Sequence, residues 1–106
     1  MVQPEAEFKK TLKHYLDMRG AFWSVIQGGA GSKQGDPDMV ICYRGRYIAI
    51  EAKTPVGRLS GWQKTRKVEI EKAGGIYIVA RTISDLSACL DRVDDEIDGV
   101  VEDMVL

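Results

Sequence analysis

The 106-residue sequence contains few cysteine, histidine and proline residues and no long hydrophobic run. Its two cysteines, Cys42 and Cys89, are too few for a disulfide framework or a cysteine-based metal cluster, and they suit a reduced, cytoplasmic setting. A membrane-spanning helix needs about 18 consecutive apolar residues, so none is predicted. Residues 1–10 have no apolar stretch behind their charges, which argues against a secretory signal. We therefore expect one cytoplasmic domain over residues 1–106, without a membrane partner.

Charge is unevenly distributed, although the net charge of the sequence is only −1. Residues 1–81 contain 14 Lys and Arg against eight Asp and Glu, a net charge of +6. Residues 82–106 contain one Arg against eight acidic residues, a net charge of −7. The first segment is therefore suited to a polyanionic partner, and the last segment is not.

Hydrophobic periodicity and turn residues predict three helices and four strands. The helices are expected at 4–20, 61–73 and 84–92, and the strands at 21–26, 39–43, 46–53 and 76–80. Ser84 is the expected N-cap of the last helix, and the Gly-rich residues 27–38 form a loop. The wholly apolar strand 76–80 is predicted to lie inside the sheet. This order predicts an α/β domain whose mixed central β-sheet is flanked by helices.

The acidic C-terminal tail, residues 94–106, contains an amphipathic stripe. Its apolar residues recur at helical spacing, at Ile97, Val100, Val101, Met104 and Val105. The tail either docks on the domain or on another subunit, or it is a frayed acidic end.

Acidic residues gather at the ends of two neighbouring strands. Asp38 precedes the first hairpin strand, and Glu51 and Lys53 end the second. Side chains alternate along a strand, so Glu51 and Lys53 share a face, and the short hairpin brings Asp38 beside Glu51. One interpretation is a surface ion pair of little energetic weight. The other is a Mg²⁺ site, because paired carboxylates and the Ala52 carbonyl offer hard oxygen ligands. Lys53 would then orient water held by the metal and stabilise charge at a phosphate.

The stretch Gly35-Asp36-Pro37-Asp38, followed by Glu51-Ala52-Lys53, resembles the PD-(D/E)xK nuclease signature. With the hairpin, the helix that carries Gln63 and the segment GGIYIVAR, residues 4–82 are similar to the VRR-nuc family of virus-type replication-repair nucleases. The resemblance implies a restriction-endonuclease-like core, Mg²⁺ or Mn²⁺ dependence and hydrolysis of DNA phosphodiesters. Small stand-alone members resemble Holliday junction resolvases, which act as homodimers on branched DNA. A bacterial and a phage origin both stay open.

Matched by position, the resemblance implies that Asp38 and Glu51 are metal ligands and that Lys53 is the catalytic lysine. Gln63 matches the glutamine on the helix after the core motif. Gln63 also fits the third position of a capping box with Ser60 as N-cap, so it can cap the helix, serve the site, or do both.

Related nucleases also use a glutamate on the first helix, for which Glu5 and Glu7 are candidates. At about 100° per residue, Glu5 lies within about 40° of the centre of the apolar face and Glu7 about 125° away. We therefore expect Glu5, rather than Glu7, to be the additional metal ligand. Asp36 replaces a residue that is more often uncharged in the family, and it is either an outer-sphere ligand or a turn former.

Basic residues of the loops and of the second helix are candidates for contacts with DNA phosphates. They are Lys33, Arg58, Lys64, Arg66, Lys67 and Lys72. No motif suggests base-specific readout, so recognition of DNA structure is expected. Trp62 is predicted to lie in the core, His14 on the surface, and Cys42 and Cys89 among packed apolar residues. A non-catalytic DNA-binding module and an end-processing exonuclease are the alternative functions.

Overall fold

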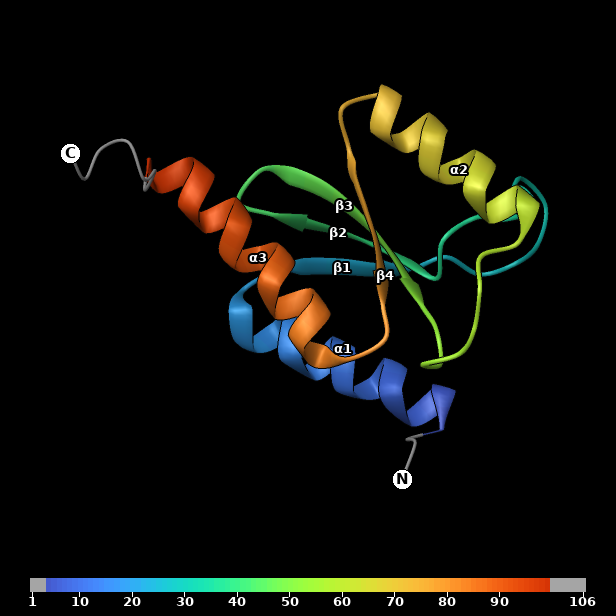
Figure 1. Ribbon diagram of the computed structural model, residues 1–106, viewed down its shortest axis with the longest axis horizontal. Helices are drawn as coiled ribbons and strands as arrows, with labels where there is room; N and C mark the ends of the chain where they lie inside the picture. Colours follow the sequence, from blue (N-terminus) through green and yellow to red (C-terminus); the bar gives the residue numbers. More distant parts are fainter. Residues whose placement is uncertain (1–3, 100–106) are drawn as a thin grey trace.

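The computed structural model describes residues 4–99 and shows three helices around a four-stranded sheet (Figure 1). In chain order the elements are α1 (Glu5–Arg19), β1 (Phe22–Val25), β2 (Met39–Tyr43), β3 (Arg46–Ala52), α2 (Gly61–Lys72), β4 (Ile76–Ala80) and α3 (Ile83–Asp98). This arrangement confirms the predicted α/β class and mixed sheet. Between residues 4 and 99, no helix combines the length and the apolar character that crossing a membrane requires.

The strands lie in the order β1-β2-β3-β4, with β1, β2 and β3 antiparallel and β4 parallel to β3. Arg44 and Gly45 join β2 to β3 with φ angles of 50° and 86°, the left-handed conformations that suit a two-residue hairpin. The prediction that strand 76–80 lies inside the sheet is wrong, since β4 is an edge strand of the sheet within the described residues. Its apolar sequence arises because α2 and α3 both pack against it.

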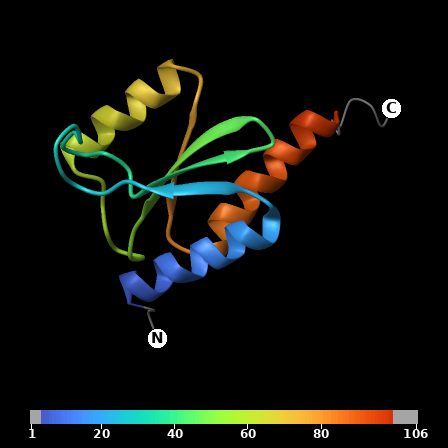
Figure 2. The ribbon, with the colours of Figure 1, turned by 180° about the vertical axis from the view of Figure 1, so that it is seen from behind.

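The hydrophobic core lies between the sheet and the pair α1 and α3. Figure 2 shows these two helices together on one side of the sheet, with α2 apart from them. The largest fully buried side chains are Leu12, Leu16, Met39, Ile41, Ile48, Ile50, Leu86, Leu90 and Val93. Cys89 is buried as predicted, but Cys42 is exposed. That prediction fails because alternate residues of β2 face away from α1 and α3.

The third helix differs from its prediction at both ends. Its N-cap is Thr82 rather than Ser84, because the Thr82 hydroxyl accepts the Asp85 N–H while the Asp85 carboxylate accepts the Thr82 N–H. The helix continues past Arg92 to Asp98, and its C-cap, Gly99, adopts the left-handed conformation. The proposed frayed end is therefore wrong for residues 94–98. Most of the apolar stripe, from Val100 onward, lies outside the described residues.

Acidic residues at the end of α3 pair with arginines from the positively charged part of the sequence. Asp94 accepts hydrogen bonds from Arg19 at 3.0 Å, from Arg44 at 2.9 Å and from the Tyr43 hydroxyl. Two further ion pairs join Arg44 to Asp98 and Arg46 to Glu96. Part of the charge asymmetry seen in the sequence is thus neutralised within the domain.

Candidate functional site

Asp38 and Glu51 meet at one end of the sheet. Met39 pairs with Ile50 in the antiparallel β2–β3 ladder, which places Asp38 opposite Glu51. Asp38 Oδ2 accepts the Ala52 N–H at 2.8 Å, so the backbone of β3 orients this carboxylate. The juxtaposition predicted from the hairpin is confirmed, whereas the roles of the two residues as metal ligands stay predictions.

Glu51 is a buried acid, only 4% exposed. Its Oε1 accepts a hydrogen bond from Gln63 Nε2 at 2.7 Å and lies 3.8 Å from Lys53 Nζ. Its Oε2 is buried and has no hydrogen-bond partner. Burial, together with repulsion from the Asp38 carboxylate, raises the Glu51 pKa to about 7, although the nearby lysines oppose the shift. A neutral acid and a carboxylate are therefore both accessible near neutral pH.

Gln63 serves the helix and the site with different atoms of one amide. Its Oε1 accepts the Ser60 N–H at 2.8 Å, and its own N–H donates to Ser60 Oγ at 3.1 Å, which completes a capping box. Its Nε2 donates to Glu51. The capping prediction is confirmed, and the amide also contacts the buried acid. Contact with a water or a phosphate stays a prediction.

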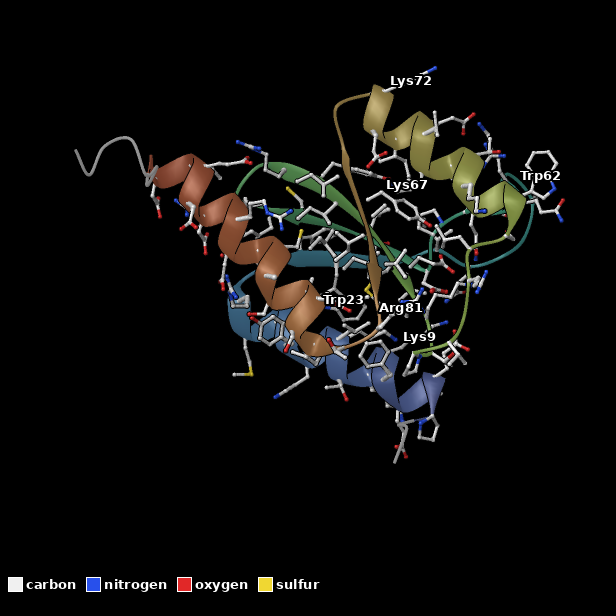
Figure 3. The ribbon with its side chains drawn as sticks, viewed as in Figure 1. Lys9, Trp23, Trp62, Lys67, Lys72 and Arg81 are labelled. Carbon is white, nitrogen blue, oxygen red and sulfur yellow. The ribbon has the colours of Figure 1, made fainter. Side chains whose placement is uncertain are left out.

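Lys9 belongs to the site and was missed from the sequence. Its Nζ lies 3.0 Å from Asp38 Oδ1 and 3.7 Å from Glu5 Oε1. Figure 3 shows Lys9 on α1, near the N-terminal end of the helix. Lys9 follows Glu5 by four residues, so the two share a helix face, and this spacing is the signal that could have identified it. Glu5 and Glu7 are both exposed, and Glu5 is linked to Asp38 only through its ion pair with Lys9 among the described contacts.

Tyr77 is a second residue that the sequence did not single out. It pairs with Ala49 of β3, and side chains alternate along the strand, so Tyr77 lies on the same sheet face as Glu51. Its buried hydroxyl has no hydrogen-bond partner, and burial followed by the charges of Glu51 and Asp38 raises its pKa to about 12. Within residues 4–99, the buried side-chain polar atoms without a partner are Glu51 Oε2 and this hydroxyl. Unpaired polar atoms on one face are typical of a place that holds water or an ion.

The donor set of the site fits a hard cation that keeps much of its water. Over residues 4–99, no three or more His, Cys, Asp or Glu side chains form a ready metal cluster. The carboxylate oxygens without a backbone or amide donor are Asp38 Oδ1 and Glu51 Oε2. Mg²⁺ is commonly held by one or two carboxylates plus water and substrate phosphate. The unpartnered Glu51 oxygen beside a second carboxylate therefore suits Mg²⁺ better than a metal that needs a closed protein cage.

The Gly-rich loop packs directly on the first turn of α2. A Cβ added to Gly35 would overlap the Trp62 carbonyl carbon, and Gly35 has a φ of +84°. Asp36 forms a turn in this loop, because its Oδ2 accepts the Lys33 N–H at 2.8 Å. The geometry therefore favours the turn-former interpretation of Asp36.

Trp62 is 50% exposed, so its predicted place in the core is wrong. It stands on the first turn of α2, where the loop covers its backbone rather than its ring. The Arg66 guanidinium lies 5.6 Å from the ring centroid. Figure 3 shows Trp62 at the outer edge of the molecule, at the opposite end of α2 from Lys72.

The candidate phosphate-binding residues fall into two groups, those that form an ion pair among residues 4–99 and those that do not. Arg66 already has partners within the protein. It donates to the Gln34 carbonyl and forms ion pairs with Asp36 of the loop and Glu69 of α2. Lys67 pairs with Glu71 at 2.8 Å. The exposed candidates without an ion pair inside residues 4–99 are Lys33, Arg58, Lys64 and Lys72.

The connection that carries Arg58 is held by a residue that sequence reasoning did not identify. Arg81 donates from one nitrogen to the carbonyls of Thr54 and Gly57, both at 2.6 Å. These bonds tie residues 54–57 to the end of β4 and fix the chain directly after Lys53. His14 is exposed, as expected from the helix pattern.

Comparisons with known proteins support the fold. No protein-family model matches the sequence, and no curated protein is significantly similar to it. A solved structure described as a "VRR_NUC domain" superposes with a TM-score of 0.65 and 19% sequence identity, over 89% of this chain and 94% of that chain. The chain thus has the fold of a VRR_NUC domain structure, in agreement with the family resemblance drawn from its motifs.

Proposed function

We propose that this protein is a metal-dependent DNA endonuclease that hydrolyses phosphodiester bonds. The observation that carries the proposal is the buried Glu51 carboxyl, which has one unpartnered oxygen and lies beside Asp38 and Lys53. Burying an unpaired polar atom is unfavourable, and such atoms concentrate where a ligand completes the site. The fold shared with a VRR_NUC domain structure supports the same proposal.

In this proposal, Asp38 and Glu51 hold Mg²⁺ or Mn²⁺, with the Ala52 carbonyl as a further donor. The bound metal supplies Lewis-acid activation of the scissile phosphate and of the attacking water. Lys53 stabilises the negative charge that develops on the phosphate oxygens. Gln63 keeps Glu51 oriented through its 2.7 Å hydrogen bond.

The substrate surface that we propose is the side of the molecule formed by the Gly-rich loop and the start of α2. Lys33, Lys64 and Arg58 present exposed positive charge there, and Lys67, although paired with Glu71, is a fourth candidate. The exposed ring of Trp62 offers a stacking surface for an unpaired base. The acidic end of α3 repels phosphates, so DNA approaches from the loop side.

The proposed substrate is branched DNA, recognised by its structure. Phosphate contacts position a duplex without reading its sequence, and an aromatic ring beside them favours sites where bases are unstacked. A four-way junction offers two strands to cut. We therefore propose a homodimer whose two-fold symmetry pairs two sites.

The test measures DNA cleavage, DNA binding and folding separately for variants of the site. Asp38→Asn and Lys53→Met are expected to reduce cleavage of a four-way junction by at least about 100-fold, the scale of losing one group that stabilises developing charge. Junction affinity and melting temperature should change little by comparison. The matched controls are Asp95→Asn and Lys10→Met, which make the same charge changes at exposed positions. Full cleavage by either site variant would overturn the proposal.

A further inference from the structure

The four carboxylate oxygens of the site have different surroundings. Asp38 Oδ2 accepts the Ala52 N–H, and Glu51 Oε1 accepts the Gln63 amide. Glu51 Oε2 is bare. Asp38 Oδ1, the remaining oxygen, lies 3.0 Å from Lys9 Nζ. A cation held by Asp38 and Glu51 would therefore have to compete with the Lys9 ammonium for Asp38 Oδ1.

Lys9 has a second carboxylate within reach. Its Nζ is 3.7 Å from Glu5 Oε1, one helical turn earlier on α1. The Lys9 side chain is 33% exposed and that of Glu5 is 56% exposed. A lysine is a compact charge on a flexible four-carbon stem, so a small torsional change moves the ammonium from Asp38 toward Glu5 and solvent.

We propose that Lys9 is an internal counter-ion, which neutralises Asp38 in the metal-free protein and moves to Glu5 when a divalent cation binds. The inference rests on the proposed metal site and concerns how that site is regulated. It makes Lys9 a positioning residue. It also gives Glu5 a different role from the one that the resemblance implied, because Glu5 receives the displaced ammonium instead of binding the metal.

The physical reason is competition between two cations for one oxygen. A divalent ion next to Asp38 repels the ammonium, and the repulsion is strong at the short distances of this partly buried site. Asp38 Oδ1 would become available to a cation only once its ion pair with Lys9 is broken. Lys9 thus lowers metal affinity while neutralising the Asp38 carboxylate beside Glu51 in the metal-free protein.

The first experiment measures Mn²⁺ binding by titration calorimetry, without DNA, for the wild type, Lys9→Met and Lys10→Met. We expect Lys9→Met to bind about fivefold more tightly, equivalent to about 1 kcal/mol. Lys10→Met removes the same charge from an exposed position on α1 and should bind like the wild type. If wild type and Lys9→Met bind equally, the inference is wrong and the metal site stands. If neither protein binds Mn²⁺, the proposed metal site fails too.

A double-mutant cycle separates the two roles of Glu5. If Glu5 receives Lys9, Glu5→Gln weakens Mn²⁺ binding about two- to threefold in the wild-type background and has no effect beside Lys9→Met. If Glu5 is itself a metal ligand, Glu5→Gln weakens binding in both backgrounds. The second outcome would overturn the inference.

A measurement on the unmodified protein covers the case in which Lys9→Met folds poorly. Lysine side chains are acetylated with and without Mg²⁺, and the extent of labelling at each lysine is read by mass spectrometry. Displacement from Asp38 predicts that labelling of Lys9 rises on adding Mg²⁺ while labelling of Lys10 stays constant. Unchanged Lys9 labelling at saturating Mg²⁺ would contradict the proposal.

Discussion

Glu51 is the residue whose surroundings say most about the site. It lies near the end of an otherwise apolar strand and is buried. One of its oxygens accepts a hydrogen bond from Gln63, and the other has no hydrogen-bond partner. Removal from water and the charge of Asp38 both disfavour its ionised form. In the metal-free protein this carboxyl therefore opposes folding at neutral and higher pH, and a bound cation would reverse that penalty.

The first prediction concerns the pH dependence of this penalty. Glu51 has a folded pKa of about 7 against an ordinary value of 4.5, so the folded state binds the proton more tightly and loses stability as pH rises from 4.5 to 7. Glu51→Gln does not titrate. In EDTA, the free energy of unfolding of the variant is compared with that of the wild type at pH 4 and at pH 8. We expect the difference, variant minus wild type, to be about 1–3 kcal/mol larger at pH 8. Urea denaturation at both pH values measures this, and an equal difference at pH 4 and pH 8 would contradict it.

The second prediction separates the two roles of Gln63. In Gln63→Glu, the carboxylate still accepts the Ser60 N–H, so the capping box survives. The donor to Glu51 is lost, and a like charge replaces it. We expect cleavage to fall about 10- to 100-fold, the usual effect of losing a residue that orients a metal ligand. Circular dichroism should show an intact α2, and unchanged cleavage rates would show that the contact with Glu51 has no role.

At the residue scale, local geometry decides what could be predicted from the sequence. Asp38, Glu51 and Lys53 could be grouped because strand alternation and a short hairpin determine their relative positions. Tyr77 could not, and although the spacing of Glu5 and Lys9 places both on one helix face, the contact between Lys9 and Asp38 forms only when α1 packs against the hairpin. Those packing contacts are long-range and leave little trace in local periodicity.

At the scale of elements, the site depends on how the Gly-rich loop meets α2. Gly35 allows the loop backbone to lie against the Trp62 backbone, and Arg66 donates to the Gln34 carbonyl to hold the loop there. The same first turn of α2 presents Gln63 to Glu51. Loop and helix therefore act as one unit that positions the buried acid.

The third prediction tests this unit. Gly35→Ala combines a strained positive φ with a backbone overlap, and we expect it to cost about 3 kcal/mol in free energy of unfolding. Gly31→Ala is the matched control, because Gly31 also has a positive φ but open space around it, and it should cost only about 1–2 kcal/mol. Urea denaturation gives both values. Equal losses would show that the contact with Trp62 is unimportant.

The elements themselves were predicted well where local signals are strong. The helix breaks at Gly20 and Gly74 and the turn at Arg44–Gly45 mark boundaries that the structure reproduces. The prediction that β4 lies inside the sheet was wrong, because an edge strand covered by two helices has the same apolar sequence pattern as an interior strand. The length of α3 was underestimated, since the acidic residues that extend it are stabilised by distant arginines.

At the scale of the whole molecule, charge is sorted between two sides. Arg19, Arg44 and Arg46 pair with the acidic end of α3. The exposed cations without an ion pair among residues 4–99 include Lys33, Lys64 and Lys72. Hydrogen bonds from Arg44 and Tyr43 hold the pKa of Asp94 below its ordinary value. This cluster fastens α3 to α1 and to the β2–β3 hairpin.

The fourth prediction follows from the sign of the Asp94 shift. A carboxyl with a lowered pKa contributes stability above its unfolded pKa, and that contribution is lost as pH falls through the folded pKa. Asp94→Asn should therefore lower the melting temperature at pH 7, and its difference from the wild type should shrink toward pH 2. Asp95→Asn, at an exposed position, is the control and should behave like the wild type. A constant difference across this range would contradict the assignment.

Cleavage by the wild-type protein is the decisive measurement of whether the site hydrolyses DNA. A four-way junction, a flap, a plain duplex and a single strand are each incubated at low salt with Mg²⁺, with Mn²⁺ and with EDTA, and the cut positions are mapped. We expect paired, symmetric nicks on the junction with either metal and none with EDTA. Tight, salt-sensitive DNA binding without cleavage under every condition would contradict this expectation and would indicate a non-catalytic binding module.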